Sequence, residues 1–326
     1  MNVAFFGTPE FALPALERLI HSHHAICLVV TRADKPKGRG QRVEAPPVKL
    51  LAQAHGLPII QPKSCRREDV AGQIRQSGAE MAVVAAYGQI LPKTVLEAPR
   101  LGCINLHPSL LPKYRGAAPI QRCILEGNTT TGITLIRLIE QMDAGPIIAQ
   151  QRVEILPDDD ASSVRDMCAV MGADMLMRVL DEAETHGDIE SEPQDHEKAT
   201  YAPPVRKEEG LIDWARSTEE IMFRIRAMQP WPGAYGYING EKRLQIVQAE
   251  PLWPNEARAL GEAANRAEPG TVSSIKKTFG FTVKTGTGHL LVTAVQPEGK
   301  GRMEASSFVN GRGIGVDDRL APPGEG

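Results

Sequence analysis

The chain has 326 residues, of which 42% are hydrophobic and 24% charged, and its formal net charge is −3. These values are typical of a soluble globular protein with room for two domains, and they exclude a disordered chain. The small negative charge also excludes a protein that binds nucleic acid over its whole surface, although a local basic patch is compatible with it.

The first half of the chain alternates short, continuously apolar runs with stretches of helical spacing. The apolar runs are 3–6, 26–30, 81–86 and 103–106, and the helical stretches are 11–20, 48–55 and 69–76. This alternation predicts an α/β fold with a doubly wound, mostly parallel sheet whose strands are buried on both faces. Two further strands, 133–139 and 147–155, and a long helix, 162–184, are expected to complete a domain over residues 1–186.

The second half has a different texture. Residues 187–206 are rich in Asp, Glu and Pro, which is typical of an exposed linker. After one expected helix, 218–228, short strand-like runs are separated by Gly, Asn and Pro; they are 236–252, 270–275, 279–285 and 289–295. Such runs predict a small β-barrel domain over 207–312, and the Gly/Pro-rich residues 313–326 are expected to be a frayed tail.

Cysteine usage and the start of the chain indicate a reduced compartment. The five cysteines are widely spaced, form no CxxC pair and suggest neither a disulfide framework nor a zinc site. The first residues lack a basic segment and a cleavage site, and no apolar stretch is long enough to span a bilayer. We therefore expect a cytoplasmic protein without membrane contact.

One cluster of histidines, His21, His23 and His24, invites comparison with a metal site. The neighbouring sequence offers no Cys or carboxylate to complete a ligand set. We therefore interpret the cluster as a solvated turn at the end of a helix and expect no metal.

The most informative motif follows the run 103–106. Residues 104–112 read Ile-Asn-Leu-His-Pro-Ser-Leu-Leu-Pro, and Asp143 follows within Met-Asp-Ala-Gly. Asn105 and His107 lie two apart on a strand, so they point to the same side of the sheet. An amide, an imidazole and a carboxylate can together bind an oxyanion, move a proton and orient the proton carrier. The local spacing alone fits equally well a histidine that only hydrogen-bonds at a strand end.

The longer string from Asn105 to Ile120, with Asp143 downstream, resembles the formyltetrahydrofolate-dependent formyltransferases. The resemblance covers nearly the whole chain, from 6–11 to 310–312. It implies a Rossmann-like catalytic domain, an OB-like barrel and 10-formyltetrahydrofolate as co-substrate. It also implies that Asn105 stabilises the oxyanion, that His107 moves protons or stabilises charge, and that Asp143 orients His107. The segment that the resemblance assigns to the folate pocket is Ser109, Leu110, Leu111 and Pro112.

Two neighbouring features have alternative interpretations. Residues 87–92, after another apolar run, fit the opposite wall of the pocket or an ordinary exit from a strand. Strand alternation turns Cys103 toward the same side as Asn105, so a thiol nucleophile is a minor alternative, because no second base lies beside it.

The acceptor is suggested by residues 32–49, which hold six basic and two acidic side chains. Gly and Pro within this segment predict a mobile loop. The loop resembles the family's insertion that grips the acceptor stem of tRNA, with Arg39 between two glycines and Arg42 as the cations concerned. The resemblance thus implies initiator methionyl-tRNA as partner of a monomeric enzyme.

Three alternatives to this acceptor and this activity remain open. They are transfer to a small amine, such as an amino sugar nucleotide or a glycinamide ribonucleotide, hydrolysis of the folate, and a non-catalytic RNA-binding module.

Overall fold

The computed structural model describes residues 1–37 and 42–324, and the chain divides into two compact units. Unit 1 comprises Met1–Ile120, Thr130–Ile155 and Ser163–Pro203, and unit 2 comprises Gln121–Thr129, Leu156–Ser162 and Pro204–Gly326. Two short early segments thus belong to unit 2, and residues 187–203 of the predicted linker, 187–206, belong to unit 1.

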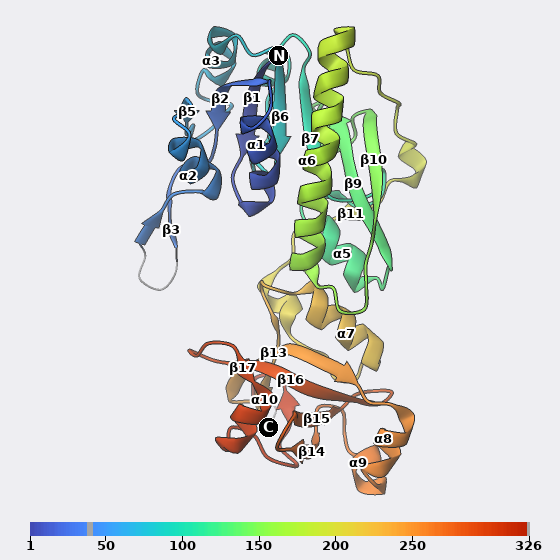
Figure 1. Cartoon of the computed structure of the whole chain (residues 1–326). Coiled ribbons are helices and arrows are strands. Elements are labelled where there is room, and N and C mark those ends of the chain that lie inside the picture. The colour runs from blue at the N-terminus through green and yellow to red at the C-terminus, as the bar shows by residue number, and fades with distance from the viewer. Residues whose placement is uncertain (38–41, 325–326) are drawn as a thin grey trace. The chain divides into compact units, whose positions relative to one another are not determined.

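A seven-stranded sheet forms the centre of unit 1 (Figure 1). In spatial order its strands are β10 (Ile147–Glu154), β9 (Thr130–Arg137), β7 (Cys103–His107), β6 (Met81–Ala85), β1 (Asn2–Gly7), β2 (Ala25–Val30) and β5 (Ile59–Ile60). The strands from β7 to β5 pair in parallel, while β9 and β10 are antiparallel additions. The predicted doubly wound, mostly parallel sheet is therefore confirmed.

Four helices of unit 1 match the stretches predicted from spacing, whereas two short ones, Lys93–Leu96 and Pro119–Leu125, lie outside those stretches. The helices are α1 (Leu13–Ile20) after a 3-10 turn at Glu10–Ala12, α2 (Pro47–Ala54), α3 (Val70–Ser77), α4 (Lys93–Leu96), α5 (Pro119–Leu125), which runs on into unit 2, and α6 (Ala161–His186). Local sequence explains their limits. The Asp69 side chain accepts a hydrogen bond from Gly72 N at 2.8 Å and caps α3, which ends at Gly78 with φ +72°.

The two faces of β7 have different neighbours. Leu106 faces α6, because a side chain at Gly172 of that helix would lie 3.2 Å from the Leu106 methyl group. Cys103 faces the other way, into the apolar cluster that contains Phe6 and Val84. Since side chains alternate along a strand, Asn105 and His107 share the face of Cys103.

The order of strands locates the carboxyl edge at which a ligand is expected. The connection from β1 leads to β2 on one side, whereas β6 lies on the other side of β1. Open α/β sheets bind their ligands outside the carboxyl ends of the strands near such a reversal. β7, the neighbour of β6, ends at this edge with His107.

The basic segment does not fold entirely as expected. The mobile loop predicted for 32–49 contains an antiparallel pair, β3 (Lys35–Lys37) and β4 (Arg42–Glu44). Residues 38–41, between these strands, lie outside the described residues.

The predicted linker is docked rather than exposed throughout. After a 3-10 turn at His196–Lys198, β11 (Tyr201–Ala202) pairs in parallel with β8 (Arg115–Gly116). The approach is close enough to require glycine, because Gly116 has φ +118° and a side chain there would lie 2.7 Å from the Ala202 carbonyl oxygen. The connector therefore packs against the segment that follows His107.

Unit 2 contains an antiparallel sheet around one core, in agreement with the predicted small barrel (Figure 1). Its path is β14 (Val272–Lys276), β15 (Gly280–Lys284), β16 (His289–Pro297), β13 (Lys242–Pro251), β12 (Ala234–Ile238) and β18 (Leu320–Ala321), and β17 (Met303–Glu304) also pairs with β16. Its helices are the 3-10 turn Lys207–Gly210, α7 (Thr218–Ala227), α8 (Pro254–Ala259), α9 (Glu262–Arg266) and α10 (Ala305–Asn310).

The described part of the predicted frayed tail, 313–324, is ordered into this sheet. Leu320 is only 1% exposed, and β18 pairs with β12. On its other side, Leu320 N donates to the Gly270 carbonyl and Val272 N donates to the Asp318 carbonyl, both at 2.8 Å. The expectation of fraying is wrong here, because the tail joins one end of the sheet to the other and buries an apolar side chain in doing so.

No helix among the described residues has the length and apolar character needed to cross a membrane.

Candidate active site

The site residues predicted from the motif gather at the carboxyl end of β7. Asn105 lies opposite Val84 of β6 and Ile136 of β9, and His107 lies opposite Thr134 of β9. Asn105 is half-buried and His107 is buried. The strand therefore holds the amide and the imidazole on one face, two residues apart, in fixed register.

His107 has a defined orientation. Its Nε2 lies 2.9 Å from the Tyr114 carbonyl oxygen, and its Nδ1 lies 3.6 Å from Asp143 Oδ2. A carbonyl oxygen can only accept, so Nε2 donates in the first contact and carries a proton. Nδ1 is therefore the nitrogen left for Asp143 and for proton exchange. The distance of 3.6 Å is longer than a direct hydrogen bond. A small movement of either side chain, or one water molecule bound to both atoms, is enough to connect them.

The Asp143 backbone is held in an unusual conformation. It has φ +50°, a region that non-glycine residues rarely adopt. Gly116 N donates to Asp143 Oδ2 at 2.9 Å, which fixes the carboxylate beside His107. The turn then requires Gly145, because a side chain there would lie 1.8 Å from the Arg137 carbonyl oxygen. The Asp-Ala-Gly sequence thus serves the backbone turn as well as the chemistry.

A buried polar chain supports this turn, and sequence reasoning missed it. Gln194, 5% exposed, donates through Nε2 to the Asp143 carbonyl at 2.8 Å and to the Gly145 carbonyl at 2.7 Å. Its Oε1 accepts from Arg115 Nη2 at 2.7 Å, and His196 Nδ1 lies 3.0 Å from the same nitrogen. Arg115 is 2% exposed. The sequence suggested a role for Arg115 only through its position in the motif. The composition of the linker gave no indication of a role for Gln194.

The predicted folate segment is folded tightly on itself. Ser109 is fully buried and its hydroxyl donates to the Lys113 carbonyl at 2.8 Å. Thr134 Oγ1 donates to the Ser109 carbonyl at 2.6 Å, and Gln150 Nε2 donates to the Leu111 carbonyl at 2.9 Å. Most backbone oxygens of the segment are thus already satisfied. The side chains left at the surface are the half-buried Leu110 and Pro112, whereas Leu111 is buried.

The segment 87–92, expected as the opposite wall, combines buried and exposed residues. The Tyr87 hydroxyl lies 3.2 Å from Cys65 Sγ, its ring packs edge-on against Phe6 with centroids 5.3 Å apart, and burial raises the pKa of the phenol. Arg32 donates to the Gly88 carbonyl. Ile90, by contrast, is 57% exposed. Tyr87 is therefore structural, and Ile90 is the apolar surface that this segment offers.

Cys103 is unsuited to nucleophilic catalysis. Its thiol is buried, and Sγ faces the Val95 and Leu96 carbonyls at 3.8 and 3.6 Å. Burial raises the pKa of the thiol to about 12. The thiolate is the reactive form, so this environment removes the alternative of a Cys103 nucleophile.

The two predicted tRNA-binding arginines fall at the border of the described residues. Arg39 lies outside them, and Arg42 is described only as the first residue of β4. Elsewhere in the basic segment, Lys49 Nζ binds Asp34 at 2.7 Å, and Gln61 Nε2 donates to the same carboxylate. This pair neutralises one cation with one anion, which leaves five basic side chains and one acidic side chain in the sequence of the segment.

Comparison with known proteins agrees with this fold. The family model described as formyl transferase matches residues 1–180, and the model described as formyl transferase, C-terminal domain, matches residues 204–313. The methionyl-tRNA formyltransferase of Symbiobacterium thermophilum is 45% identical over 99% of this chain and 96% of its own length. That of a Thermus thermophilus strain is 44% identical over 98% of this chain and 99% of its own.

A solved structure extends the comparison at the level of fold. WlaRD, a sugar 3N-formyl transferase crystallised in the presence of dTDP and 5-N-formyl-THF, superimposes with a TM-score of 0.64 and 17% identity over 92% of this chain and 99% of that chain. With both family models matched in order and relatives above 40% identity over nearly its full length, the chain belongs to the formyl transferase family.

Proposed function

We propose that the chain transfers the formyl group of 10-formyltetrahydrofolate to the α-amino group of methionine on initiator tRNA. The observation that carries the proposal is the approach of His107 Nδ1 to Asp143 Oδ2, 3.6 Å apart, beside Asn105 on the same face of β7. Relatives named methionyl-tRNA formyltransferase, 45% and 44% identical over nearly the whole chain, support the acceptor.

The reaction requires three things of the protein. The methionine amine attacks the formyl carbon, a C–N bond forms, and negative charge develops on the formyl oxygen. The bond from that carbon to N10 of the folate then breaks, the amine loses a proton and N10 gains one. Because the nucleophile comes from the substrate, no activated side chain is needed, only an oxyanion donor, a proton carrier and a group that orients it.

The residues of β7 and of the Asp143 turn suit these roles. The Asn105 amide donates to the oxyanion, for which a single donor of this kind is worth about 3–4 kcal/mol. His107 exchanges the proton through Nδ1, because Nε2 is committed to the Tyr114 carbonyl. Asp143, held by Gly116 N, stabilises the imidazolium that forms on proton uptake.

The folate is proposed to lie against the segment from Ser109 to Pro112. Leu110 and Pro112 offer apolar surface there, while Ser109 and Leu111 keep the segment rigid from inside. Ile90, exposed on the neighbouring segment, supplies an apolar surface of the kind that a flat pterin needs on its second face.

The acceptor tRNA is proposed to contact Arg39 and Arg42 of the basic segment and the barrel of unit 2. Cations exposed or half-exposed on unit 2 suit a phosphate backbone; they are Arg206, Lys207, Lys276, Lys277, Lys300 and Arg302. Guanidinium groups bind phosphate through two hydrogen bonds or stack on bases, which gives Arg39 the larger weight. We further propose that the enzyme acts as a monomer in the cytoplasm.

The catalytic assignment is tested by replacing His107. The variant His107→Ala should lower kcat by about 10²- to 10⁴-fold, the range for loss of a positioned acid–base group, and should leave tRNA affinity within twofold. His21→Ala is a matched control, because His21 is exposed and hydrogen-bonds only within its own turn. Unchanged turnover in His107→Ala would remove the catalytic assignment and favour a non-catalytic RNA-binding module.

The acceptor is tested separately, with charged initiator and elongator tRNAs and a salt series. Binding through several phosphates should weaken with a slope of about 0.9 in log–log terms per contact, and Arg39→Ala should lower that slope by about one contact. Lys93→Ala is the control, since Lys93 also carries one positive charge and is 64% exposed. A flat response to salt would favour a small amine as acceptor.

Hydrolysis of the folate, the third alternative, has its own readout. If tetrahydrofolate is released at the full rate in the absence of any amine, hydrolysis replaces transfer as the proposed activity.

A further inference from the structure

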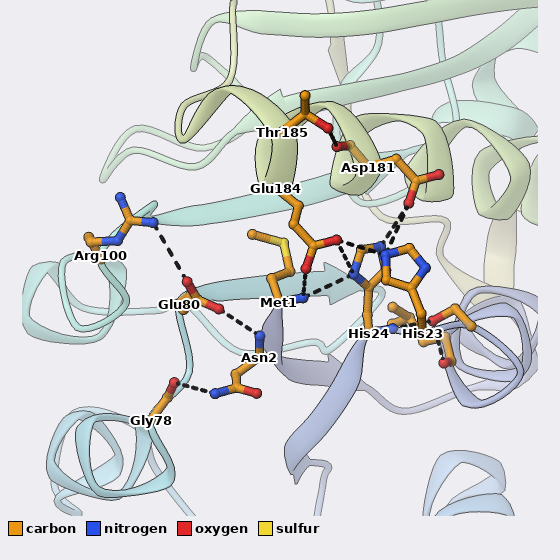
Figure 2. A network of polar contacts seen from close by, with 12 residues as sticks. Met1, Asn2, His23, His24, Gly78, Glu80, Arg100, Asp181, Glu184 and Thr185 are labelled. Carbon is orange, nitrogen blue, oxygen red and sulfur yellow. Dashed lines mark hydrogen bonds and ion pairs between the residues drawn. The ribbon is translucent and has the colours of Figure 1, made fainter.

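A second cluster of polar side chains lies on unit 1 and contains none of the candidate active-site residues (Figure 2). It joins His23 and His24, in the turn between α1 and β2, to Asp181 and Glu184 on α6. The sequence interpretation of a solvated turn depended on the lack of nearby carboxylates. The fold corrects this, because α6 supplies two carboxylates from far along the chain.

The spacing of the three central groups is that of metal ligands. His24 Nε2 lies 3.2 Å and His23 Nε2 lies 3.7 Å from Asp181 Oδ1. One ligand atom from each residue lies within 4.8 Å of the others. Ligands at about 2.0–2.2 Å from a tetrahedral zinc ion are about 3.4 Å apart, so an ion fits with only small side-chain adjustment.

His24 gives an independent indication. Its side chain is 0% exposed, yet Nε2 makes no hydrogen bond to any described residue and faces Asp181 from a misaligned position. Buried polar atoms are nearly always satisfied, so an orphaned ring nitrogen in such a cluster calls for an explanation.

A simple ion-pair network accounts for only part of the cluster. Glu184 contacts the Met1 amine through one oxygen and His23 Nε2, at 2.7 Å, through the other. These contacts explain the orientation of Glu184. The Met1 amine also lies 3.3 Å from His24 Nδ1. These contacts leave His24 Nε2 without a hydrogen bond to any described residue, 3.2 Å from the Asp181 oxygen that also lies 3.7 Å from His23 Nε2.

We propose that His23, His24 and Asp181 bind one divalent transition-metal ion of the zinc type, with water or Glu184 in the fourth position. Two imidazoles and a carboxylate suit zinc and its neighbours, whereas Mg²⁺ and Ca²⁺ prefer oxygen ligands alone.

The role of the ion is structural. His23 and His24 precede the amino end of β2, while His107 ends the parallel strand β7, so the two sites lie at opposite edges of the sheet. An ion here ties α6 to the turn between α1 and β2.

The test is a titration with Co²⁺ on full-length protein that carries no polyhistidine tag and has a free amino terminus. We expect one equivalent of Co²⁺ to give the intense visible bands of tetrahedral coordination, and Zn²⁺ to displace it. His23→Ala and Asp181→Asn should each weaken binding by about tenfold or more, because each removes a ligand. Both side chains are more than half exposed, at 63% and 55%, so these variants are expected to fold.

The matched control is His186→Ala, which removes an exposed imidazole from the same helix but outside the cluster. It should bind Co²⁺ as the parent does. Absence of tetrahedral bands, equal binding by His23→Ala and Asp181→Asn, or displacement by Mg²⁺ at the same concentration as Zn²⁺ would each overturn the proposal. Chelation of the ion should lower the thermal stability of the parent and leave formyl transfer at low temperature intact, so failure here is distinguishable from failure of the proposed function.

Discussion

Replacement of Gln194 by alanine probes the support of the Asp143 turn. The side chain is buried and makes four hydrogen bonds: it donates to the Asp143 and Gly145 carbonyls and accepts two from the Arg115 guanidinium. Truncation removes all four and leaves a buried cation without its amide acceptor. A hydrogen bond to a charged group contributes about 1.5–3 kcal/mol, so the loss of both bonds from Arg115 costs about 3–5 kcal/mol, a large part of the roughly 5–15 kcal/mol that stabilises a domain.

The expected result is a loss of about 3–5 kcal/mol in the free energy of unfolding of unit 1. Urea unfolding followed by far-UV circular dichroism measures it, with tryptophan fluorescence as an internal reference. All three tryptophans, Trp214, Trp231 and Trp253, belong to unit 2, so their fluorescence reports the other unit. In the formyl-transfer assay, kcat should fall while the KM values for the folate and for tRNA stay near those of the parent. The reason is that Gln194 binds the main-chain carbonyl of Asp143, and so positions this residue, without contacting its carboxylate.

The companion variant Gln194→Glu separates the two functions of the side chain. It keeps an acceptor for Arg115 and adds an opposite charge, but it places a carboxylate against the Asp143 and Gly145 carbonyls. Stability should therefore fall less than in Gln194→Ala, while kcat falls at least as much. An alanine variant within about 0.5 kcal/mol of the parent, the range of an ordinary surface substitution, with unchanged kcat would refute this account of the turn.

Four further outcomes are expected. Asn105→Ala should lower kcat by about 10²- to 10³-fold in the formyl-transfer assay with normal unfolding, and a loss confined to KM would contradict the oxyanion role. Cys103 should react with iodoacetamide at pH 8 about a thousandfold more slowly than an ordinary thiol, because its pKa is raised from 9.0 to about 12; mass spectrometry of labelled peptides measures this, and labelling at the rate of an exposed thiol would contradict it. The same shift makes stability fall as pH rises from about 9 toward 12, since the unfolded thiol ionises first. Gly270→Ala should destabilise unit 2 by about 1–3 kcal/mol in fluorescence-detected unfolding, because Gly270 has φ +94° and a methyl group would lie 2.6 Å from the Leu320 carbonyl oxygen. A variant as stable as the parent would exclude this strain.

Periodicity predicted the parts of the fold that depend on local pattern. The buried strands β1, β2, β6 and β7 and the helices α1, α2 and α3 lie within a few residues of their predicted limits, because an apolar run bounded by turn residues has few other ways to fold. The placement of Asn105 and His107 on one face of β7 was likewise predicted from the alternation of side chains along a strand.

Contacts between segments far apart in the chain could not be predicted from the local sequence pattern. Gln194 lies in a polar stretch whose composition indicates an exposed linker, and only the fold shows its amide against the Asp143 turn. The carboxylate of Asp181 beside His24 is similarly invisible in the sequence. The prediction for the tail was wrong because Gly and Pro suggest fraying, whereas the tail buries Ile314, Leu320 and Ala321 and places a short strand beside β12.

The short strand β18 lies beyond residue 312, the predicted end of the barrel domain, so truncation at that limit removes part of the sheet. A chain cut after residue 312 would lose β18 and uncover the main-chain groups of β12 and of the start of β14 that now face it. Unpaired strand edges pair with other chains, so the shortened protein, which also loses the core residues Ile314 and Leu320, should be prone to self-association.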